Sequence, residues 1–424
     1  MSDLARRALL VTVFRNDLVS KDLAADHLKE LALLSQTYGV IPADSLLLPC
    51  RKFVAATLLT SGKLEELVAR LEEVKPDVVI FDDEISPAQQ RNLEKILSVP
   101  VIDRTEVILG VFADRAHTKE AKLQVELAHV QYQLPRLKRL WTHLGRQAGT
   151  TGGGGAYLKG EGEKQIEIDR RMIKQRVGAL QRDIQALAAH RETVRSSRQR
   201  SNLPIFGLVG YTNAGKTTLL NVLTGADAFV EDKLFATLDT TTRKLTLANN
   251  QEMLLIDTVG FIRKLPHQLV AAFRSTLEEV SYADILLHVV DVSHPAAAEQ
   301  AETTVQVLKE LRAANKPILT VLNKIDRCKD LQMAARIRLK YPHTIPISAL
   351  TGQGFDELQE MMLEELKKRR TVAKLRIPQK DYGVVSEVLR QGNLLQQEYE
   401  ENDVLIQIEL PTALAHRLGR YEEK

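Results

Sequence analysis

The chain has 424 residues, of which 44% are hydrophobic and 27% charged, and its formal net charge is +3. This is an ordinary composition for globular domains, and the chain is long enough for two to four of them, so fibrous and low-complexity classes are excluded. The two cysteines, Cys50 and Cys328, are too few and too far apart for a disulfide framework or a metal-ligand spacing, which favours a reducing cytoplasm. No stretch approaches the ~18 apolar residues of a membrane span, so we expect no stable membrane anchor, while transient membrane association stays open.

Residues 1–110 alternate strand-like apolar runs with helical patterns, which predicts a small N-terminal α/β domain. Ser86 followed by Pro87 is a typical helix start. The predicted strands are residues 8–14, 77–81 and 100–102, and the predicted helices are residues 22–38, 64–74 and 87–97.

Residues 111–202 show two heptad seams, which predict an antiparallel helical hairpin. The intervening loop, residues 145–162, contains four consecutive glycines and cannot be helical. Pro135 interrupts the first helix and should kink it. The seams are Leu123, Leu127, Val130, Leu134, Leu137, Trp141 and Leu144, and then Ile173, Val177, Leu180, Ile184 and Leu187.

The positive charge of the chain is concentrated in this hairpin. Residues 136–202 hold 15 Lys or Arg and 6 Asp or Glu, a local net charge of +9, and the remainder of the chain is −6. This asymmetry indicates a polyanionic partner such as RNA. The alternative is a solvated outer face of a coiled coil.

From residue 203 to about 370 the pattern becomes strand, glycine-rich turn and helix, and its first turn is a P-loop. The loop follows an apolar strand and precedes a helical run, so its backbone amides and the helix N-terminus can hold phosphates. Lys216 is expected to reach the β- and γ-phosphates, and the Thr217 hydroxyl to bind Mg²⁺. The whole loop is Gly210, Tyr211, Thr212, Asn213, Ala214, Gly215, Lys216 and Thr217.

A second motif, Asp257, Thr258, Val259 and Gly260, closes the next apolar strand. Such a pattern is common by chance, but its position after the lysine favours a Walker-B-type aspartate that holds Mg²⁺ through water. The Gly260 N–H would then face the γ-phosphate.

A third motif, Asn323, Lys324, Ile325 and Asp326, favours guanine as the base. The Asp326 carboxylate can accept both N1–H and N2–H of guanine, whereas adenine would leave it unpaired, a penalty worth about 10⁴ in discrimination. Lys324 would pack over the purine. Ser348, Ala349 and Leu350 end the following strand, where the Ala349 N–H could read guanine O6. The sequence therefore predicts GTP and GDP as ligands.

The switch segment offers two candidate hydroxyls for Mg²⁺. Thr237, 21 residues after Lys216, is favoured over Thr241, and residues 240–242 more readily form a turn or the start of a strand. The candidate nucleotide-binding segment is Phe235, Ala236, Thr237, Leu238 and Asp239. Thr217 and Thr237 are thus the predicted metal ligands, and Lys216, Thr237, Gly260 and Asn213 the predicted catalytic residues.

Residues 371–424 are expected to form a small C-terminal α+β domain with ferredoxin-like order. The predicted elements are a strand over 373–377, a helix over 382–389, strands over 394–399 and 403–410, and a helix over 411–418.

With these motifs assembled, the chain from about residue 5 to 370 resembles the HflX family, within the Obg-related translation-factor GTPases. The resemblance rests on the P-loop, on residues 235–239, 257–263 and 323–326, and, outside them, on residues 133–137, 160–163 and 169–171. The glycine loop departs from the Arg-rich run expected there, since it has Gly152 to Gly155 and Lys159.

The resemblance implies a multidomain α/β fold with a Ras-like P-loop G domain, and a GTP hydrolase that acts as a monomer. It also implies binding to the large (50S) ribosomal subunit and its RNA, not to DNA, stimulation of hydrolysis by that subunit, and rescue or splitting of stalled ribosomes under stress. Two alternatives stay open: a GTP-gated binding module, and a GTPase partner of an RNA-modifying or membrane protein.

Phe261 follows Gly260, where many GTPases have a water-orienting glutamine. An apolar side chain cannot orient water, so we expect slow intrinsic turnover, with the missing element supplied by K⁺, by backbone groups or by the ribosome. Asn213 is a candidate K⁺ ligand. An asparagine that merely suits the backbone of the loop is an equal alternative.

Overall fold

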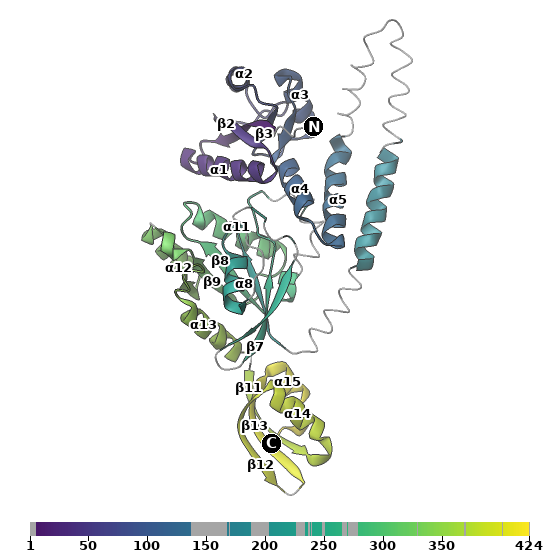
Figure 1. Cartoon of the computed structure of the whole chain (residues 1–424), viewed down its shortest axis with the longest axis vertical. Coiled ribbons are helices and arrows are strands. Elements are labelled where there is room, and N and C mark those ends of the chain that lie inside the picture. The colour runs from purple at the N-terminus through teal and green to yellow at the C-terminus, as the bar shows by residue number, and fades with distance from the viewer. Residues whose placement is uncertain are drawn as a thin grey trace.

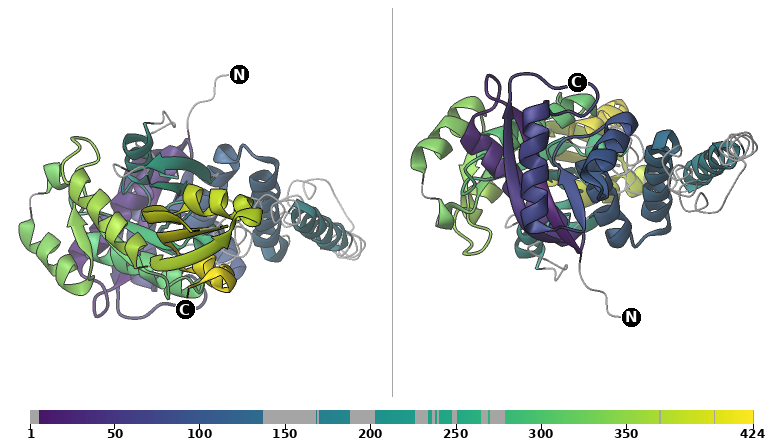
Figure 2. Two further views of the ribbon diagram at one scale, coloured as in Figure 1. Left: turned by 90° about the horizontal axis from the view of Figure 1, so that it is seen from below. Right: turned by 90° about the horizontal axis from the view of Figure 1, so that it is seen from above.

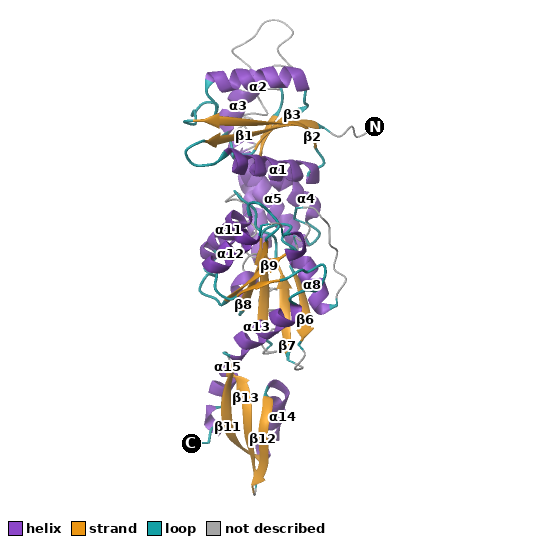
Figure 3. Cartoon of the chain, turned by 90° about the vertical axis from the view of Figure 1, so that its left-hand side faces the viewer, coloured by secondary structure: helices purple, strands orange, loops and turns teal. Residues whose placement is uncertain are grey.

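The chain folds into an elongated stack of units with a helical pair along one side (Figures 1 and 3). Viewed along the long axis, the helix of residues 170–187 stands out to one side of the sheets (Figure 2). The computed structural model describes residues 6–136, 168, 170–187, 203–225, 234–235, 238, 240–247, 251–264, 269, 279–328, 330–368, 370–400 and 402–423.

The N-terminal domain is a parallel four-stranded sheet in the order β2-β1-β3-β4, with helices on both faces. β1 is buried on both faces, since its run from Ala8 to Phe14 is apolar except for the buried Thr12. α1 covers the face toward the next unit, and α2 and α3 cover the other (Figure 3). The elements are β1 (Arg7–Arg15), α1 (Lys21–Thr37), β2 (Ile41–Cys50), α2 (Ser61–Val74), β3 (Val78–Phe81), α3 (Pro87–Leu97), β4 (Val101–Asp103) and α4 (Arg104–Arg115).

Two of these elements differ from the sequence-based expectation. The pattern does not predict β2, because Pro42 and Pro49 interrupt it, and β2 lies at the edge of the sheet, where proline is tolerated. α4 was not predicted as a separate helix, and the proposed boundary at residue 110 falls inside it. The predicted N-cap at Ser86 is confirmed, with a capping box to Gln89.

The helical pair consists of α5 (Lys119–Gln133) and the helix of residues 170–187, joined by the Arg176–Glu126 ion pair. α5 ends before Pro135 and continues as a 3₁₀ turn, Leu134–Arg136. Its buried residues are Leu127 of the predicted seam and, outside the seam, Ala121, Gln124, Val125, Ala128 and Tyr132, and α4 packs against this helix. Leu123 and Val130 of the seam are half-buried. The predicted loop 145–162 lies outside the described residues.

The central unit is a six-stranded sheet in the order β10-β9-β8-β5-β7-β6, parallel except for β6. The carboxyl ends of β5, β7 and β9 therefore lie at one edge of the sheet, where ligands bind in such folds. The elements are β5 (Ile205–Gly210), α8 (Lys216–Thr224), β6 (Thr241–Thr246), β7 (Glu252–Asp257), β8 (Ile285–Asp291), α11 (Ala297–Glu310), β9 (Ile318–Asn323), α12 (Leu331–Lys340), β10 (Thr344–Pro346) and α13 (Phe355–Lys367).

The C-terminal unit has the predicted order of strand, helix, two strands and helix. Its antiparallel sheet is ordered β11-β13-β12, as in the first three strands of a ferredoxin-like arrangement. Among the described residues of the whole chain, no helix is long and apolar enough to cross a membrane. The C-terminal elements are β11 (Arg370–Pro378), α14 (Tyr382–Gln391), β12 (Asn393–Glu400), β13 (Asp403–Pro411) and α15 (Thr412–Arg417).

Candidate nucleotide-binding site

The P-loop joins β5 to α8 at the carboxyl edge of the central sheet. Gly215 caps α8 with φ +93°, and a Cβ there would lie 2.3 Å from Nδ2 of Asn323. Only glycine fits both the left-handed backbone and this close approach. The N-terminus of α8 consequently faces the loop with its amides, which is a favourable arrangement for a phosphate.

Lys216 is buried, with 6% of its surface exposed. Its Nζ donates to the carbonyl oxygens of Gly210 at 3.2 Å and Tyr211 at 2.8 Å. Burial lowers the pKa of Lys216 to about 8, with Lys324 adding to the effect and Asp257 opposing it. A bound phosphate would supply the negative charge that this buried ammonium lacks.

Thr217 and Asp257 form an oxygen pair beside the lysine. The Thr217 hydroxyl donates to Oδ2 of Asp257 at 2.7 Å, and Asp257 is wholly buried at the end of β7. A hydroxyl and a carboxylate are hard ligands of the kind that Mg²⁺ prefers. The residues present therefore fit this ion.

Thr258 and Val259 anchor the second motif against the sheet. The Thr258 hydroxyl donates to the Leu208 carbonyl at 2.6 Å, and the side chains of Thr258 and Val259 are both buried. The chain then passes directly over the P-loop, since a Cβ on Gly260 would lie 2.8 Å from Cα of Thr212 and 3.0 Å from Nζ of Lys216. Glycine is required here by the close approach of two backbones.

Phe261 bridges the two motifs through its backbone. Its N–H donates to the Gly210 carbonyl at 3.0 Å, and its carbonyl accepts from the Thr212 N–H at 2.7 Å. The side chain is 1% exposed and lies in a core cluster that also contains Leu31 and Phe112 of the N-terminal domain. Phe261 thus belongs to the core, where it cannot hold a water molecule.

The candidate base-reading residues lie at the ends of β9 and β10. Asn323 donates from Nδ2 to the Ala214 carbonyl at 2.9 Å and accepts from the Ala349 N–H at 3.0 Å, which joins the P-loop to this region. The Ala349 amide, a candidate for guanine O6, donates to Asn323 in this structure. Leu350 is 71% exposed.

Lys324 adopts a left-handed backbone with φ +64° and donates from Nζ to the Asn213 carbonyl at 2.8 Å and to Asp291 at 2.7 Å. The Ser348 hydroxyl donates to Asp326 at 2.6 Å. The structure thus brings the residues of the third motif to the same edge of the sheet as the P-loop, and Asn323 and Lys324 contact the loop directly.

The switch segment is described only in part. Phe235 is buried, and its ring centroid lies 4.5 Å from that of Phe112 in α4; Leu238 is also buried. Ala236, Thr237 and Asp239 lie outside the described residues. Thr241 begins β6 and is in register with Asp257, which agrees with the expected strand start at residues 240–242.

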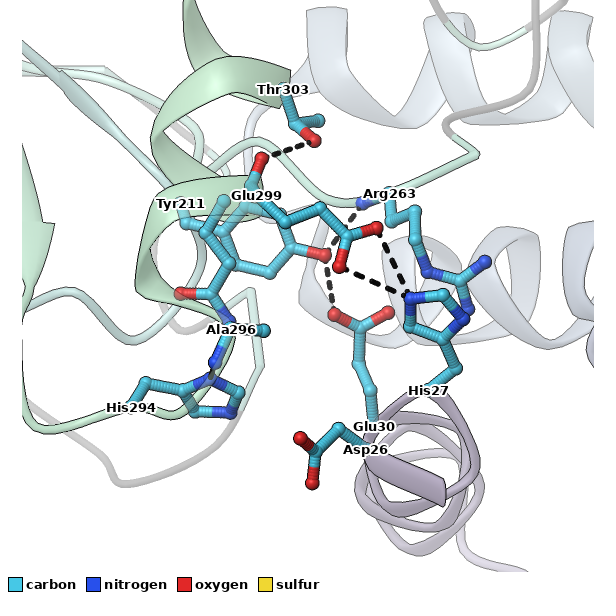
Figure 4. A pocket seen from close by; sticks show the side chains of 10 residues that line it. Asp26, His27, Glu30, Tyr211, Arg263, His294, Ala296, Glu299 and Thr303 are labelled. Carbon is cyan, nitrogen blue, oxygen red and sulfur yellow. Dashed lines mark hydrogen bonds and ion pairs between the residues drawn. The ribbon is translucent and has the colours of Figure 1, made fainter. Parts of the chain in front are cut away.

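Sequence reasoning missed an interdomain cluster of charged residues. Glu30, Asp82 and Arg104 of the N-terminal domain bind Tyr211 of the P-loop and Arg263, three residues after Gly260 (Figure 4 shows Glu30, Tyr211 and Arg263). Single charged residues up to 181 positions apart give no periodic signal. Only the place of Tyr211 within the P-loop could have pointed to this cluster.

A strand, P-loop and helix with an adjacent hydroxyl–carboxylate pair, in a sheet of this order, define a P-loop GTPase, a GTP hydrolase. Residues 205–324 match the family described as 50S ribosome-binding GTPase. Residues 25–113 and 115–198 match the families described as GTP-binding GTPase N-terminal and GTP-binding GTPase Middle Region. The chain belongs to the HflX family of ribosome-associated GTPases.

Full-length relatives show the same family. The chain is 45% identical over 410 residues to GTPase HflX of Chlamydia pneumoniae, covering 96% of this chain and 86% of the relative. It is 38% identical to GTPase HflX of Escherichia coli K12, covering 99% and 97%. A solved GTP-binding protein from Sulfolobus solfataricus in complex with GDP is 27% identical, with a TM-score of 0.42 and coverage of 85% and 98%.

Proposed function

We propose that the protein binds the large ribosomal subunit through its helical pair and couples GTP hydrolysis to the rescue or splitting of stalled ribosomes under stress. The observation that carries the proposal is the exposed basic face of the helix of residues 170–187. Its exposed cations are Arg170, Arg171, Lys174, Arg176 and Arg182, of which Arg176 pairs with Glu126 of α5. Leu180 of its apolar seam is fully buried, and the other seam residues are half-buried.

This basic face suits RNA phosphates. Lys and Arg side chains that neutralise phosphates release counterions, so binding should weaken steeply with salt. The match of the central unit to 50S ribosome-binding GTPases supports the large subunit as the source of that RNA. We further propose that the protein acts as a cytoplasmic monomer, does not bind DNA and has no stable membrane anchor.

We propose the four domains expected from the sequence, residues 1–110, 111–202, 203–370 and 371–424, with the first boundary moved to the end of α4 at Arg115. The P-loop amides and Lys216 hold the β- and γ-phosphates, Asp326 reads guanine, and the Gly260 N–H faces the γ-phosphate. Thr217 and Thr237 hold Mg²⁺, with Asp257 acting through water. When bound, this ion neutralises phosphate charge.

Hydrolysis is in-line attack of water on the γ-phosphorus, achieved by positioning and charge neutralisation. Lys216 provides the cation of this chain closest to the phosphates. Phe261 contributes no hydrogen bond to water, because its side chain is buried in the core. Intrinsic turnover is therefore slow, and the ribosome, K⁺ at Asn213, or backbone groups supply the missing orientation.

The test measures GTP hydrolysis in K⁺ buffer with and without purified large subunits. We expect stimulation of about tenfold or more, which is roughly 1.4 kcal/mol off the barrier. The double variant Arg171→Glu/Lys174→Glu should lose stimulation and co-sedimentation, whereas Lys374→Glu, a charge reversal at an exposed site of the C-terminal unit, should keep both.

Absence of stimulation and of co-sedimentation would reject the ribosomal role and leave the GTPase class standing. Capture of a protein rather than of ribosomes would then favour a GTP-gated binding module or a partner of an RNA-modifying or membrane protein.

A further inference from the structure

Asp291 ends β8 beside Lys324, the lysine expected to pack over the purine. β8 and β9 are neighbours in the central sheet (Figure 3). Asp291 is in register with Asn323, the residue before Lys324. Oδ2 of Asp291 lies 2.7 Å from Nζ of Lys324, in an ion pair whose side chains are 12% and 22% exposed. A partly buried pair is screened less by salt than a surface pair, so this contact holds the lysine in place.

The other carboxylate oxygen of Asp291 is held by the turn that follows β8. Oδ1 accepts from the Ser293 N–H at 3.0 Å and from the Ser293 hydroxyl at 2.6 Å. Because the two oxygens are engaged by different partners, the carboxylate is oriented before any ligand arrives. Asp291 therefore offers Lys324 a preformed anion, which loses little freedom in holding the lysine.

Lys324 in turn contacts the P-loop. Its Nζ donates to the Asn213 carbonyl at 2.8 Å, so one ammonium joins the end of β8 to the loop. The stem between the backbone and Nζ is the part expected to lie over the purine, and fixing both of its ends fixes the stem. A lysine side chain has much rotamer freedom to lose, and here part of that loss precedes the binding of a nucleotide.

Asp291 also offsets repulsion between two cations of the site. Lys324 adds to the lowering of the pKa of Lys216, which shows that the two ammonium groups repel each other. Repulsion alone would turn Lys324 away from the P-loop. The Asp291 carboxylate supplies an attraction that keeps Lys324 beside Asn213.

We propose that Asp291 is a positioning residue for guanine-nucleotide binding, which acts through Lys324. By holding the lysine at the P-loop with its stem at the base position, it lowers the cost of ordering the site when GDP or GTP binds. The sequence motifs do not point to Asp291, because β8 is the parallel strand of this sheet whose carboxyl end carries none of them. The proposal rests on the proposed reading of guanine by Asp326, with the purine against Lys324, and not on the ribosomal role.

The test is a double-substitution cycle on the full-length chain with Asp291→Asn, Lys324→Met and both together. GDP and a non-hydrolysable GTP analogue are titrated in Mg²⁺ buffer. Asparagine keeps an acceptor for Ser293 and removes the charge, and methionine keeps an apolar stem and removes the ammonium. We expect each single substitution to weaken the binding of both nucleotides by about fivefold to tenfold, the effect of losing one charge-assisted hydrogen bond. Adding Asp291→Asn to Lys324→Met should cost less than about twofold more.

Turnover separates positioning from a role in the reaction. Asp291→Asn should raise KM for GTP and leave kcat at saturation within about twofold, because the contact it weakens is made equally in the ground state and the transition state. Glu302→Gln is the matched control. It removes the carboxylate of an exposed pair with Lys340, between α11 and α12 of the same unit, and should leave affinity and turnover unchanged.

Unchanged affinity in Asp291→Asn, with a loss in Lys324→Met, would overturn the proposal. A rise in affinity would overturn it as well, since the carboxylate would then act only by repelling phosphate. Equal losses from Asp291→Asn in the unmodified and the Lys324→Met chains would show that Asp291 supports the fold and does not act through the lysine. Unchanged affinity in Lys324→Met would reject the placement of the purine itself, and the proposal with it.

Discussion

The Ser348 hydroxyl donates a hydrogen bond to the Asp326 carboxylate, with 2.6 Å between Oγ and Oδ1. Ser348 follows β10 and Asp326 follows β9, so two neighbouring strands fix one carboxylate in the position expected of the guanine reader. A carboxylate that is already oriented loses little freedom when a base binds, which favours discrimination by hydrogen bonding.

We expect Asp326→Asn to lower the affinity for GTP by about 10³-fold or more and to raise the affinity for xanthosine triphosphate. The substituted amide offers a donor where guanine N1–H and N2–H require acceptors, and xanthine has a carbonyl in place of the N2 amine. Titration of both nucleotides by calorimetry tests this. Ser348→Ala, which leaves the carboxylate in place, should cost about tenfold at most; unchanged GTP affinity in Asp326→Asn would reject the assignment of Asp326.

Lys216→Ala should weaken nucleotide binding by about thirtyfold or more. The buried ammonium donates to the carbonyl oxygens of Gly210 and Tyr211 in the P-loop, the loop that is expected to hold the phosphates. Removing it deletes the cation that offsets the phosphate charge, a charge-assisted contact worth roughly 2 kcal/mol or more. Fluorescence titration with labelled GDP measures the loss. Lys244→Ala, which removes an exposed lysine of β6, should bind as the unmodified chain does.

K⁺ should accelerate hydrolysis relative to Na⁺ in the unmodified chain and not in Asn213→Ala. Asn213 is exposed in the P-loop with φ +59°, and asparagine tolerates this backbone well, so the alternative explanation of the residue is conformational. Asn213→Gly separates the two, because glycine adopts the same backbone and has no side-chain oxygen. K⁺ stimulation that survives in Asn213→Gly would leave only the backbone role.

The nucleotide site could be predicted from the sequence because its parts are local. Each motif closes a parallel strand, and parallel strands end at one edge of the sheet, so Lys216, Asp257 and Asp326 had to come together. The interdomain cluster of Glu30, Asp82, Arg104, Tyr211 and Arg263 could not be predicted. Glu30 and Arg104 are isolated charges in separate helices, and only the packing of the two domains brings them to Tyr211.

Tertiary packing also decided the elements that the pattern failed to predict. The leucine seam of α5 predicted one buried face, and Leu127 of that seam is buried. Ala121, Val125 and Ala128 lie outside the seam and are buried as well, because α4 also packs against this helix. β2 carries two prolines, and only its place at the edge of the sheet makes a strand possible. In both cases the neighbouring elements in the fold, which the local sequence does not specify, decide the structure of the segment.

Arg136→Ala should lower the free energy of unfolding by about 3 kcal/mol. Arg136 is buried where α5 ends, stacks on Tyr132 with 3.6 Å to the ring centroid, and donates to the Ile85 carbonyl at 2.7 Å and to Asp103 at 3.2 Å. Burial already raises the pKa of Asp103, and the variant would leave that carboxyl without its cation.

Denaturant unfolding followed by far-UV circular dichroism measures this loss in the free energy of unfolding. Arg176→Ala removes the exposed pair with Glu126 on the same helical pair and should cost less than about 1 kcal/mol. Equal effects of the two substitutions would contradict the structural role of Arg136.

His288 should make the stability of the central unit fall as the pH falls from about 6.5 to 4. Its ring is fully buried in β8, neither ring nitrogen has a hydrogen-bond partner among the described residues, and the ring lies edge-on to Tyr341 at 5.7 Å. Burial lowers the pKa of His288 from 6.5 to about 4. In this window the unfolded chain binds a proton that the folded chain does not, so acid favours unfolding, by at most about 3 kcal/mol.

The substitution His288→Leu tests this origin. Leucine removes the titrating group and two unsatisfied polar atoms at similar volume, so it should match or exceed the stability of the unmodified chain at pH 7. It should also lose the part of the acid slope between pH 6.5 and 4 that His288 contributes, whereas His416→Gln, at an exposed site, should keep it. Because carboxylates also contribute to acid unfolding, the decisive quantity is the difference between the variant and the unmodified chain. A difference that does not change with pH would show that His288 is not the group that titrates.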